Sequence, residues 1–163
     1  MGSVQRLLAG AGLLVLGGCA MVNDLGMRAV SSKVDAMVLV GGELLAGKVL
    51  LVPDRTGRAM FEGGSGSVRS CMGGMRYTAS NGGVLELRCD NGLEVQLQTT
   101  YLSETRGFGY GVPVAPVGAA SGTGPQVVSL AFGLSAPEAA SYLRPPPGKK
   151  LVEDFKTGLL ELQ

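Results

Sequence analysis

The sequence predicts a mostly β domain, a small antiparallel sheet, sandwich or barrel-like structure with one short helix near the C-terminus. Three observations carry this prediction. Apolar and polar residues alternate with a period of two along several short segments, and 27 of the 163 residues are glycine, many of them in turn signals between those segments. A capping-box sequence near the C-terminus predicts the helix.

The composition is that of a folded domain with a modest core. Hydrophobic residues make up 45% of the chain and charged residues 17%, which argues against disorder. The formal net charge of +1 gives no electrostatic basis for binding nucleic acid. Because there are four Phe, four Tyr and no Trp, the core must rest on Val, Leu, Met and Ala, and a covalent cross-link would help to stabilise it.

The first strands are predicted between residues 34 and 61. Apolar residues occupy every second position of residues 34–40, and the Gly41-Gly42 turn signal leads into a second strand at residues 44–52. Residues 53–57, Pro-Asp-Arg-Thr-Gly, indicate another turn, and a short strand follows at residues 58–61.

The alternation in residues 84–101 predicts a β-hairpin. Its register follows from the requirement that the apolar side chains of both strands lie on the same, buried face. A two-residue loop would place apolar side chains opposite polar ones along the whole ladder. A three-residue turn, Asp90-Asn91-Gly92, with Gly92 in the left-handed conformation, avoids this. The predicted pairs are Cys89 with Leu93, Leu87 with Val95, Leu85 with Leu97 and, on the solvent face, Arg88 with Glu94.

Residues 107–125 are rich in Gly, Pro and Ala and have no periodicity, so we predict a long loop there. This segment carries Phe108 and Tyr110 between glycines, and the two aromatic rings are candidate contacts for a partner or a glycan. The alternative is that both rings fold back and cover the sheet.

A strand at residues 126–132 and a helix at residues 136–143 are predicted next. Ser135-Ala136-Pro137-Glu138 matches a capping box with proline in the first turn, and the prolines at 145–147 end the helix. The last residues, 149–163, fit either a helical turn at their start or a closing strand at their end.

The chemistry-bearing residues exclude several kinds of site. The chain contains no histidine, which excludes Ser-His-Asp and Cys-His catalytic sites and His-ligated zinc. Residues 42–49 nearly match a phosphate-binding loop, but Val49 replaces the hydroxyl residue that would hold magnesium, and the pattern is that of a strand and turn. We therefore predict no cofactor, no metal and no nucleotide.

Two groups of charged residues are candidate sites. Glu86 and Glu94 fall on the predicted solvent face of the hairpin, where solvation explains them. Arg144, Lys149 and Lys150 flank the prolines and could touch anionic lipid or peptidoglycan, although such clusters are more often simply solvated.

The N-terminal segment has the pattern of a secretory signal. Arg6 is the only charged residue before position 19, residues 7–16 are apolar apart from two glycines, and this run is too short to span a bilayer. Leu16-Gly17-Gly18-Cys19 resembles the lipobox of bacterial lipoprotein precursors. The predicted organisation is a signal peptide at 1–18, a tether at 19–32 and a β-rich periplasmic domain at 33–163.

The resemblance to lipoprotein precursors implies a membrane anchor at Cys19. In that family the cysteine thiol receives diacylglycerol, the signal is cut before it, and the new amino group is acylated, so that several chains anchor stably. Ala20, where Asp favours inner-membrane retention in enterobacterial members, indicates the outer membrane. The alternative is an ordinary secretory signal cut elsewhere, with Cys19 incidental.

If Cys19 carries lipid, Cys71 and Cys89 remain. An even pair in an exported chain predicts a disulfide, whereas two free buried thiols are the alternative. The spacing fits neither a redox nor a zinc motif.

The expected function is that of a non-enzymatic, membrane-anchored lipoprotein with a structural or protein-interaction role in the cell envelope, with an envelope protein or a cell-wall component as its partner. A ligand-binding or inhibitor-like module using residues 107–125 is the first alternative. A histidine-free cell-wall hydrolase is the second, and it would need two carboxylates, or a Ser and a Lys, that converge in a cleft.

Overall fold

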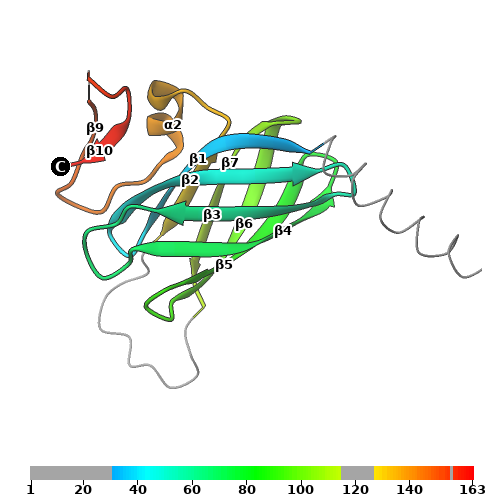
Figure 1. Cartoon of the computed structure of the whole chain (residues 1–163), viewed down its shortest axis with the longest axis horizontal. Helices are drawn as coiled ribbons and strands as arrows, with labels where there is room; N and C mark the ends of the chain where they lie inside the picture. Colours follow the sequence, from blue (N-terminus) through cyan, green and yellow to red (C-terminus); the bar gives the residue numbers. More distant parts are fainter. Residues whose placement is uncertain (1–30, 115–126, 155) are drawn as a thin grey trace, which may run out of the picture. The chain divides into compact units, whose positions relative to one another are not determined.

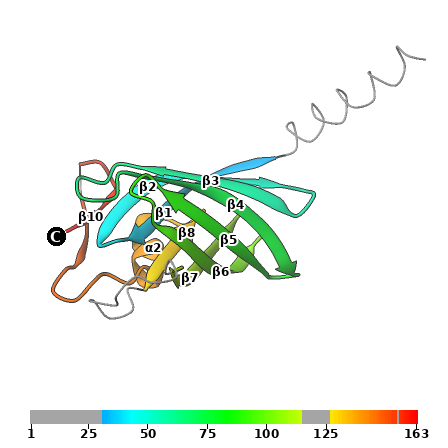
Figure 2. The ribbon, with the colours of Figure 1, turned by 90° about the horizontal axis from the view of Figure 1, so that it is seen from below.

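The computed structural model describes residues 31–114, 127–154 and 156–163. Eight antiparallel strands, each paired with the next in sequence, form a barrel that closes where β8 pairs with β1 (Figure 1, Figure 2). The predicted mostly β fold is thereby confirmed. The barrel strands are β1 (Ser32–Val40), β2 (Glu43–Val52), β3 (Thr56–Glu62), β4 (Ser70–Ala79), β5 (Gly82–Cys89), β6 (Glu94–Ser103), β7 (Arg106–Pro113) and β8 (Val128–Phe132).

The strands predicted from alternation are confirmed, with ends shifted by at most two residues. The β1–β2 turn uses Gly41 and Gly42, whose φ angles of +59° and +80° are those that a two-residue hairpin loop requires. In the next turn Arg55 takes a φ of +67°. Its neighbour Asp54 stabilises this turn by accepting hydrogen bonds from the amide and hydroxyl of Thr56.

The β5–β6 hairpin has the predicted three-residue turn, and Gly92 is left-handed with a φ of +83°. The Cys89 amide donates to the Leu93 carbonyl at 2.9 Å, which closes the turn. Burial of the apolar face therefore selected the register, as expected. The remaining pairs are also the predicted ones: Leu87 with Val95, Leu85 with Leu97, and Arg88 with Glu94.

The prediction of a loop over residues 107–125 is wrong for its first part. Residues Arg106–Pro113 form β7, which pairs with both β6 and β8, while residues 115–126 lie outside the described part of the chain. The inward positions of β7 begin with glycines, so no apolar alternation reveals a buried strand. At Gly111 a Cβ atom would overlap the Gln96 carbonyl of β6, and this close backbone approach requires glycine.

Apolar side chains fill the barrel interior. Cys71 and Cys89 lie opposite each other on β4 and β5, and the predicted disulfide between them is confirmed. This bond links the neighbouring strands β4 and β5 within the core. The buried interior residues are Ala36, Val38, Val40, Leu45, Val49, Leu51, Ala59, Phe61, Val68, Cys71, Met75, Leu85, Leu87, Cys89, Val95, Leu97, Val128, Leu130 and Phe132.

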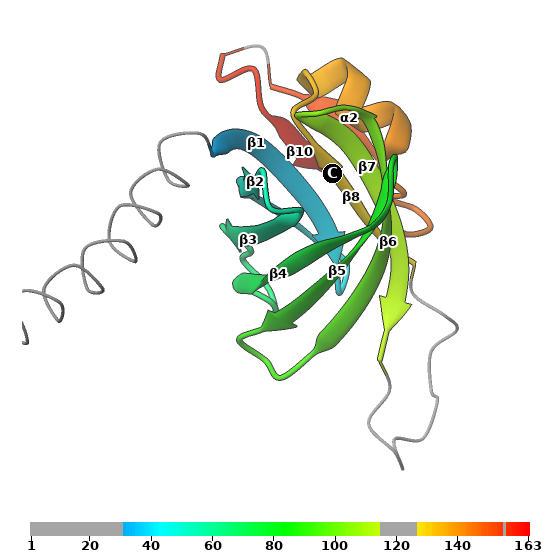
Figure 3. The same ribbon diagram turned by 90° about the vertical axis from the view of Figure 1, so that its right-hand side faces the viewer.

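The C-terminal segment forms a strap on the outside of the barrel, consisting of helix α2 (Ala136–Tyr142) and the short hairpin of β9 (Leu151–Glu153) and β10 (Leu160–Leu162) (Figure 3). The helical-turn alternative for the start of residues 149–163 is therefore wrong, and the final strand pairs with β9. A second apolar cluster joins the strap to the outer face of β1 and β8, with Leu39, Ala131, Ala139, Leu143 and Leu160 as its buried members.

The start of α2 follows the predicted capping box. The Glu138 carboxylate accepts hydrogen bonds from the Ser135 amide at 3.1 Å and from its hydroxyl at 2.8 Å. The same carboxylate binds Arg106 of β7 at 2.6 Å, so the helix cap is also a link between strap and barrel.

Candidate functional site

Three aromatic side chains pack together inside the barrel and form part of its core. Tyr77 and Tyr101 stack with ring centroids 4.4 Å apart, and Tyr101 meets the ring of Phe132 edge-on at 5.5 Å. The Tyr101 hydroxyl donates to Sδ of Met75 at 2.6 Å. Burial, together with the neighbouring Tyr77, raises the pKa of Tyr101 above its usual range, so this phenol stays neutral.

Thr99 places a hydroxyl in the same interior. The residue is 4% exposed, and its Oγ1 makes no hydrogen bond to any described residue. An interaction with Thr99 opposes the rise in the pKa of Tyr101, but the Thr99 hydroxyl makes no hydrogen bond of good geometry. In register Thr99 lies between Gly83 and Gly109, which provide no polar side chain. A buried hydroxyl without a partner costs about 1–3 kcal/mol.

The two aromatic residues predicted as partner contacts, Phe108 and Tyr110, lie on the outer face of β7. Phe108 stacks on Tyr142 of α2 with centroids 4.4 Å apart, and the Arg144 guanidinium lies over the Tyr110 ring at 5.6 Å. Both residues are half-buried. Their position agrees with the alternative in which the rings cover the sheet, and the strap accounts for their packing.

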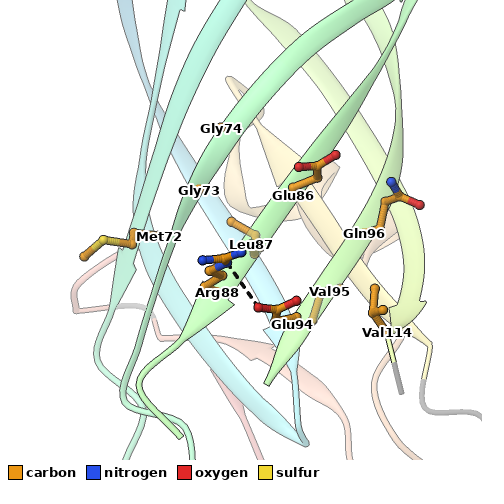
Figure 4. A pocket seen from close by; sticks show the side chains of 10 residues that line it. All are labelled: Met72, Gly73, Gly74, Glu86, Leu87, Arg88, Glu94, Val95, Gln96 and Val114. Atoms are coloured by element: carbon orange, nitrogen blue, oxygen red, sulfur yellow. Dashed lines mark ion pairs between the residues drawn. The ribbon is translucent and has the colours of Figure 1, made fainter. Parts of the chain in front are cut away.

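The outer wall is hollowed over β4, β5 and β6, and we call this feature the outer-wall hollow (Figure 4). Its volume is about 580 Å³. Met72 and Val114 lie at opposite sides of it and are 61% and 51% exposed. The lining residues are Met72, Gly73, Gly74, Glu86, Leu87, Arg88, Glu94, Val95, Gln96 and Val114.

One arginine–carboxylate pair lines the hollow, and a second pair joins its residue Glu86 to Arg76 outside the lining. Arg88 Nε lies 3.2 Å from Glu94 Oε1, and Arg76 Nη2 lies 2.9 Å from Glu86 Oε1. The dashed line in Figure 4 marks the first of these ion pairs. All four side chains are more than half exposed. Exposed pairs of this kind contribute about 0–1 kcal/mol to stability. A partner that bound one of these charged groups in place of its present ion-pair partner would therefore cost the fold little stability. Glu86 and Glu94 are thus on the solvent face, as predicted.

Two adjacent glycines of β4 line the hollow and differ in what surrounds them. At Gly73 a Cβ atom would overlap the Glu86 carbonyl, so glycine is needed where β4 and β5 approach closely. At Gly74 a Cβ atom would meet nothing within 4 Å. Gly74 therefore leaves backbone exposed that any other residue would cover, and a side chain placed there would enter the hollow without disturbing the fold.

A methionine pair adjoins the hollow and was not predicted from the sequence. Met60 of β3 and Met72 of β4 are cross-strand partners, and 59% and 61% of their surfaces are exposed. Their proximity depends on β4, which the sequence patterns do not reveal. For Met60 alone the sequence did hold a signal, because exposed and buried positions alternate along residues 56–62 and Met60 falls on the same side as Arg58 and Glu62.

The other sequence-predicted residues are scattered. Cys19 lies outside the described residues. Of the basic cluster, Arg144 lies over Tyr110, whereas Lys149 donates to the carbonyl of Gly42, in the turn between β1 and β2, at 3.3 Å. In the segment resembling a phosphate-binding loop, Lys48 is on β2 and pairs with Asp35 at 2.6 Å.

Within residues 31–114, 127–154 and 156–163, no group of three or more His, Cys, Asp or Glu side chains could hold a metal ion. The helix in this part of the chain is too short to cross a membrane. Comparisons with models of protein families, with curated proteins and with solved structures found no match to this chain.

Proposed function

We propose that this protein is an exported lipoprotein, held at the periplasmic side of the outer membrane through an acylated Cys19, whose barrel is a non-enzymatic interaction domain. The outer-wall hollow is its contact surface for another protein of the envelope. The leader, with its resemblance to a lipobox, supports the anchor. The Cys71–Cys89 disulfide supports export, since such bonds persist in oxidising compartments.

The hollow is the observation on which the interaction role depends. Side chains pack the barrel interior, whereas the hollow is an accessible concave surface on the outer wall. It combines exposed Met72 and Val114 with Arg88, and methionine and arginine are enriched in protein interfaces. Methionine also adapts its shape to a partner at small energetic loss.

The anchor is tested by labelling cells with radioactive or alkyne-bearing palmitate. The wild-type chain should incorporate the label, and Cys19→Ala should not, because its thiol is the site of the first acylation. Mass spectrometry of the purified wild type should give a chain that begins at residue 19. Label retained in Cys19→Ala would contradict the anchor.

The contact surface is tested in living cells with a photo-crosslinking amino acid at Gln96, which is exposed within the hollow. The matched control places it at Glu161, an exposed position on β10 of the strap. We expect a discrete adduct from position 96 and none from position 161 at equal expression. A bulky Gly74→Trp substitution should abolish the adduct, since its ring would fill the hollow. Equal adducts from both positions, or none from position 96, would contradict the proposal.

A further inference from the structure

The outward-facing residues of β3 form an exposed row beside the hollow, in which a cation, a methionine and an anion follow one another. The strand's outward residues Arg58, Met60 and Glu62 are exposed, and the residues between them are buried. Neither the Arg58 nor the Glu62 side chain forms an ion pair or hydrogen bond with any described residue. These are uncompensated charges of opposite sign on either side of an exposed methionine.

The two charges cannot compensate each other within one molecule. They lie four residues apart on one strand, which separates their Cα atoms by about 13 Å. Their cross-strand neighbours are also uncharged. Arg58 lies between Leu50 and Gly74, and Glu62 lies between Ala46 and Ser70.

We propose that two copies of this chain associate through this face, with β3 of one copy running antiparallel over β3 of the other about a twofold axis at Met60. Such an axis maps each residue before Met60 onto the position equally far after it. Arg58 of each copy therefore meets the partner's Glu62. Met60 and Met72, which are cross-strand partners, form an apolar cluster with the same two residues of the partner.

The distances suit this arrangement. Arg58 and Glu62 are each about 7 Å along the strand from Met60. If the two sheets cross at about 30°, as packed sheets commonly do, the paired positions separate sideways by only about 3–4 Å, which the long side chains span. Two charge pairs beside an adaptable methionine centre make a self-complementary surface.

The same row contains two further cations, Lys48 and Arg88, at the outer positions next to the methionines. Each already pairs with an acid of its own copy, Lys48 with Asp35 and Arg88 with Glu94, so neither brings an uncompensated charge to the axis. The contact is small, and we expect a weak, reversible dimer. This inference goes beyond the proposed function and does not depend on the anchor. Met72 also lines the hollow, so the second copy and the envelope partner would compete for this residue.

The test is a charge swap in the full-length chain, purified in excess detergent and studied by analytical ultracentrifugation from about 10 μM to 1 mM. The wild type should show a reversible monomer–dimer equilibrium. Arg58→Glu and Glu62→Arg should each weaken dimerisation by about tenfold or more, because symmetry turns both charge pairs into repulsions. The double swap should restore the dissociation constant to within about threefold of the wild type, because it re-forms both pairs.

Matched controls separate this contact from an effect of net charge. Lys33→Glu and Glu161→Arg change the charge equally at exposed positions on β1 and β10 and should leave dimerisation unchanged. Circular dichroism should give wild-type spectra and melting curves for each variant. If a charge variant unfolds, Met60→Lys, which places two ammonium groups at the axis, should abolish the dimer. A wild type that stays monomeric to 1 mM, a dimer unaffected by the single swaps, or a double swap that restores nothing would each overturn the proposal.

Discussion

The barrel and the strap belong to one unit but are held in different ways. Every barrel strand is paired on both sides, and a disulfide joins two of the strands from inside the core. The strap consists of a seven-residue helix and two three-residue strands. Its attachment depends on one apolar cluster, on aromatic contacts such as the Phe108–Tyr142 stack, and on a few polar links, such as the Arg144 amide donating to Ser129 Oγ at 2.8 Å.

This difference predicts two levels of stability in one unit. A closed barrel has no free strand edge, so we expect its strands to open as one cooperative unit. An isolated hairpin of this length is not stable in water, so the strap depends on the barrel surface beneath it. The strap should therefore open locally while the barrel stays folded, and the reverse should not occur. The next four predictions test this asymmetry.

The largest effect is expected from the disulfide. Replacing Cys71 and Cys89 together by Ala should lower the free energy of unfolding by about 3 kcal/mol, because the bridge closes a segment with a separation of 18 residues. Barrel and strap should then unfold together at lower urea, as monitored by circular dichroism. Cys19→Ala is the matched control and should leave the midpoint unchanged. A loss below about 1 kcal/mol would mean that the strand pairing alone holds the barrel.

The second prediction separates the strap from the barrel. Leu143 is 2% exposed and packs in the cluster beneath the strap. Leu143→Ala should weaken that cluster by about 2 kcal/mol, which corresponds to about 30-fold faster amide exchange in α2, β9 and β10. Exchange in β3, β4 and β5 should not change. Leu102→Ala, at an exposed leucine of β6, is the control. Equal acceleration in β3–β5 would show that strap and barrel open as one.

The hairpin of β5 and β6 shows what the sequence could predict. Both strands alternate cleanly between apolar and polar residues, and only one register buries all the apolar side chains. This alternation was therefore sufficient to place Arg88, Glu94 and Gly92 correctly. Helix α2 was predictable for a similar reason, since Ser135 and Glu138 define its start locally.

Strands β4 and β7 show why the rest could not be predicted. Their inward faces include Gly73, Gly107 and Gly109, and glycine gives no apolar signal at a buried position. Glycine occurs there because neighbouring backbones approach closely, which is a property of the closed barrel and not of the local sequence. The hollow and the Met60–Met72 pair both depend on β4, so neither could be predicted from the sequence alone.

The third prediction concerns the barrel interior, and here the substitution should raise the free energy of unfolding instead of lowering it. Thr99→Val keeps the shape of the side chain and removes a buried hydroxyl that has no hydrogen-bond partner among the described residues. We expect a gain of about 1 kcal/mol in the free energy of unfolding, with no change in strap exchange. Thr100→Val, on the exposed face of the same strand, should change stability little. A loss of stability at position 99 would indicate that the hydroxyl is bonded after all.

The smallest effect is expected from pH, and in the strap it should appear at the start of α2. Hydrogen bonds from Ser135, with help from Arg106, lower the pKa of Glu138 below its ordinary value of 4.5, so the folded strap favours the ionised carboxylate. This stabilisation is present above pH 4.5 and is lost as the pH falls through the lowered pKa, when the proton removes the cap and the link to β7. The amide signals of Ser135 and Glu138, followed by NMR from about pH 6 to about pH 2.5, should therefore change as the pH falls through the lowered pKa of Glu138. Glu138→Gln should lack this transition, and a variant that titrates like the wild type would assign the acid sensitivity to another carboxylate.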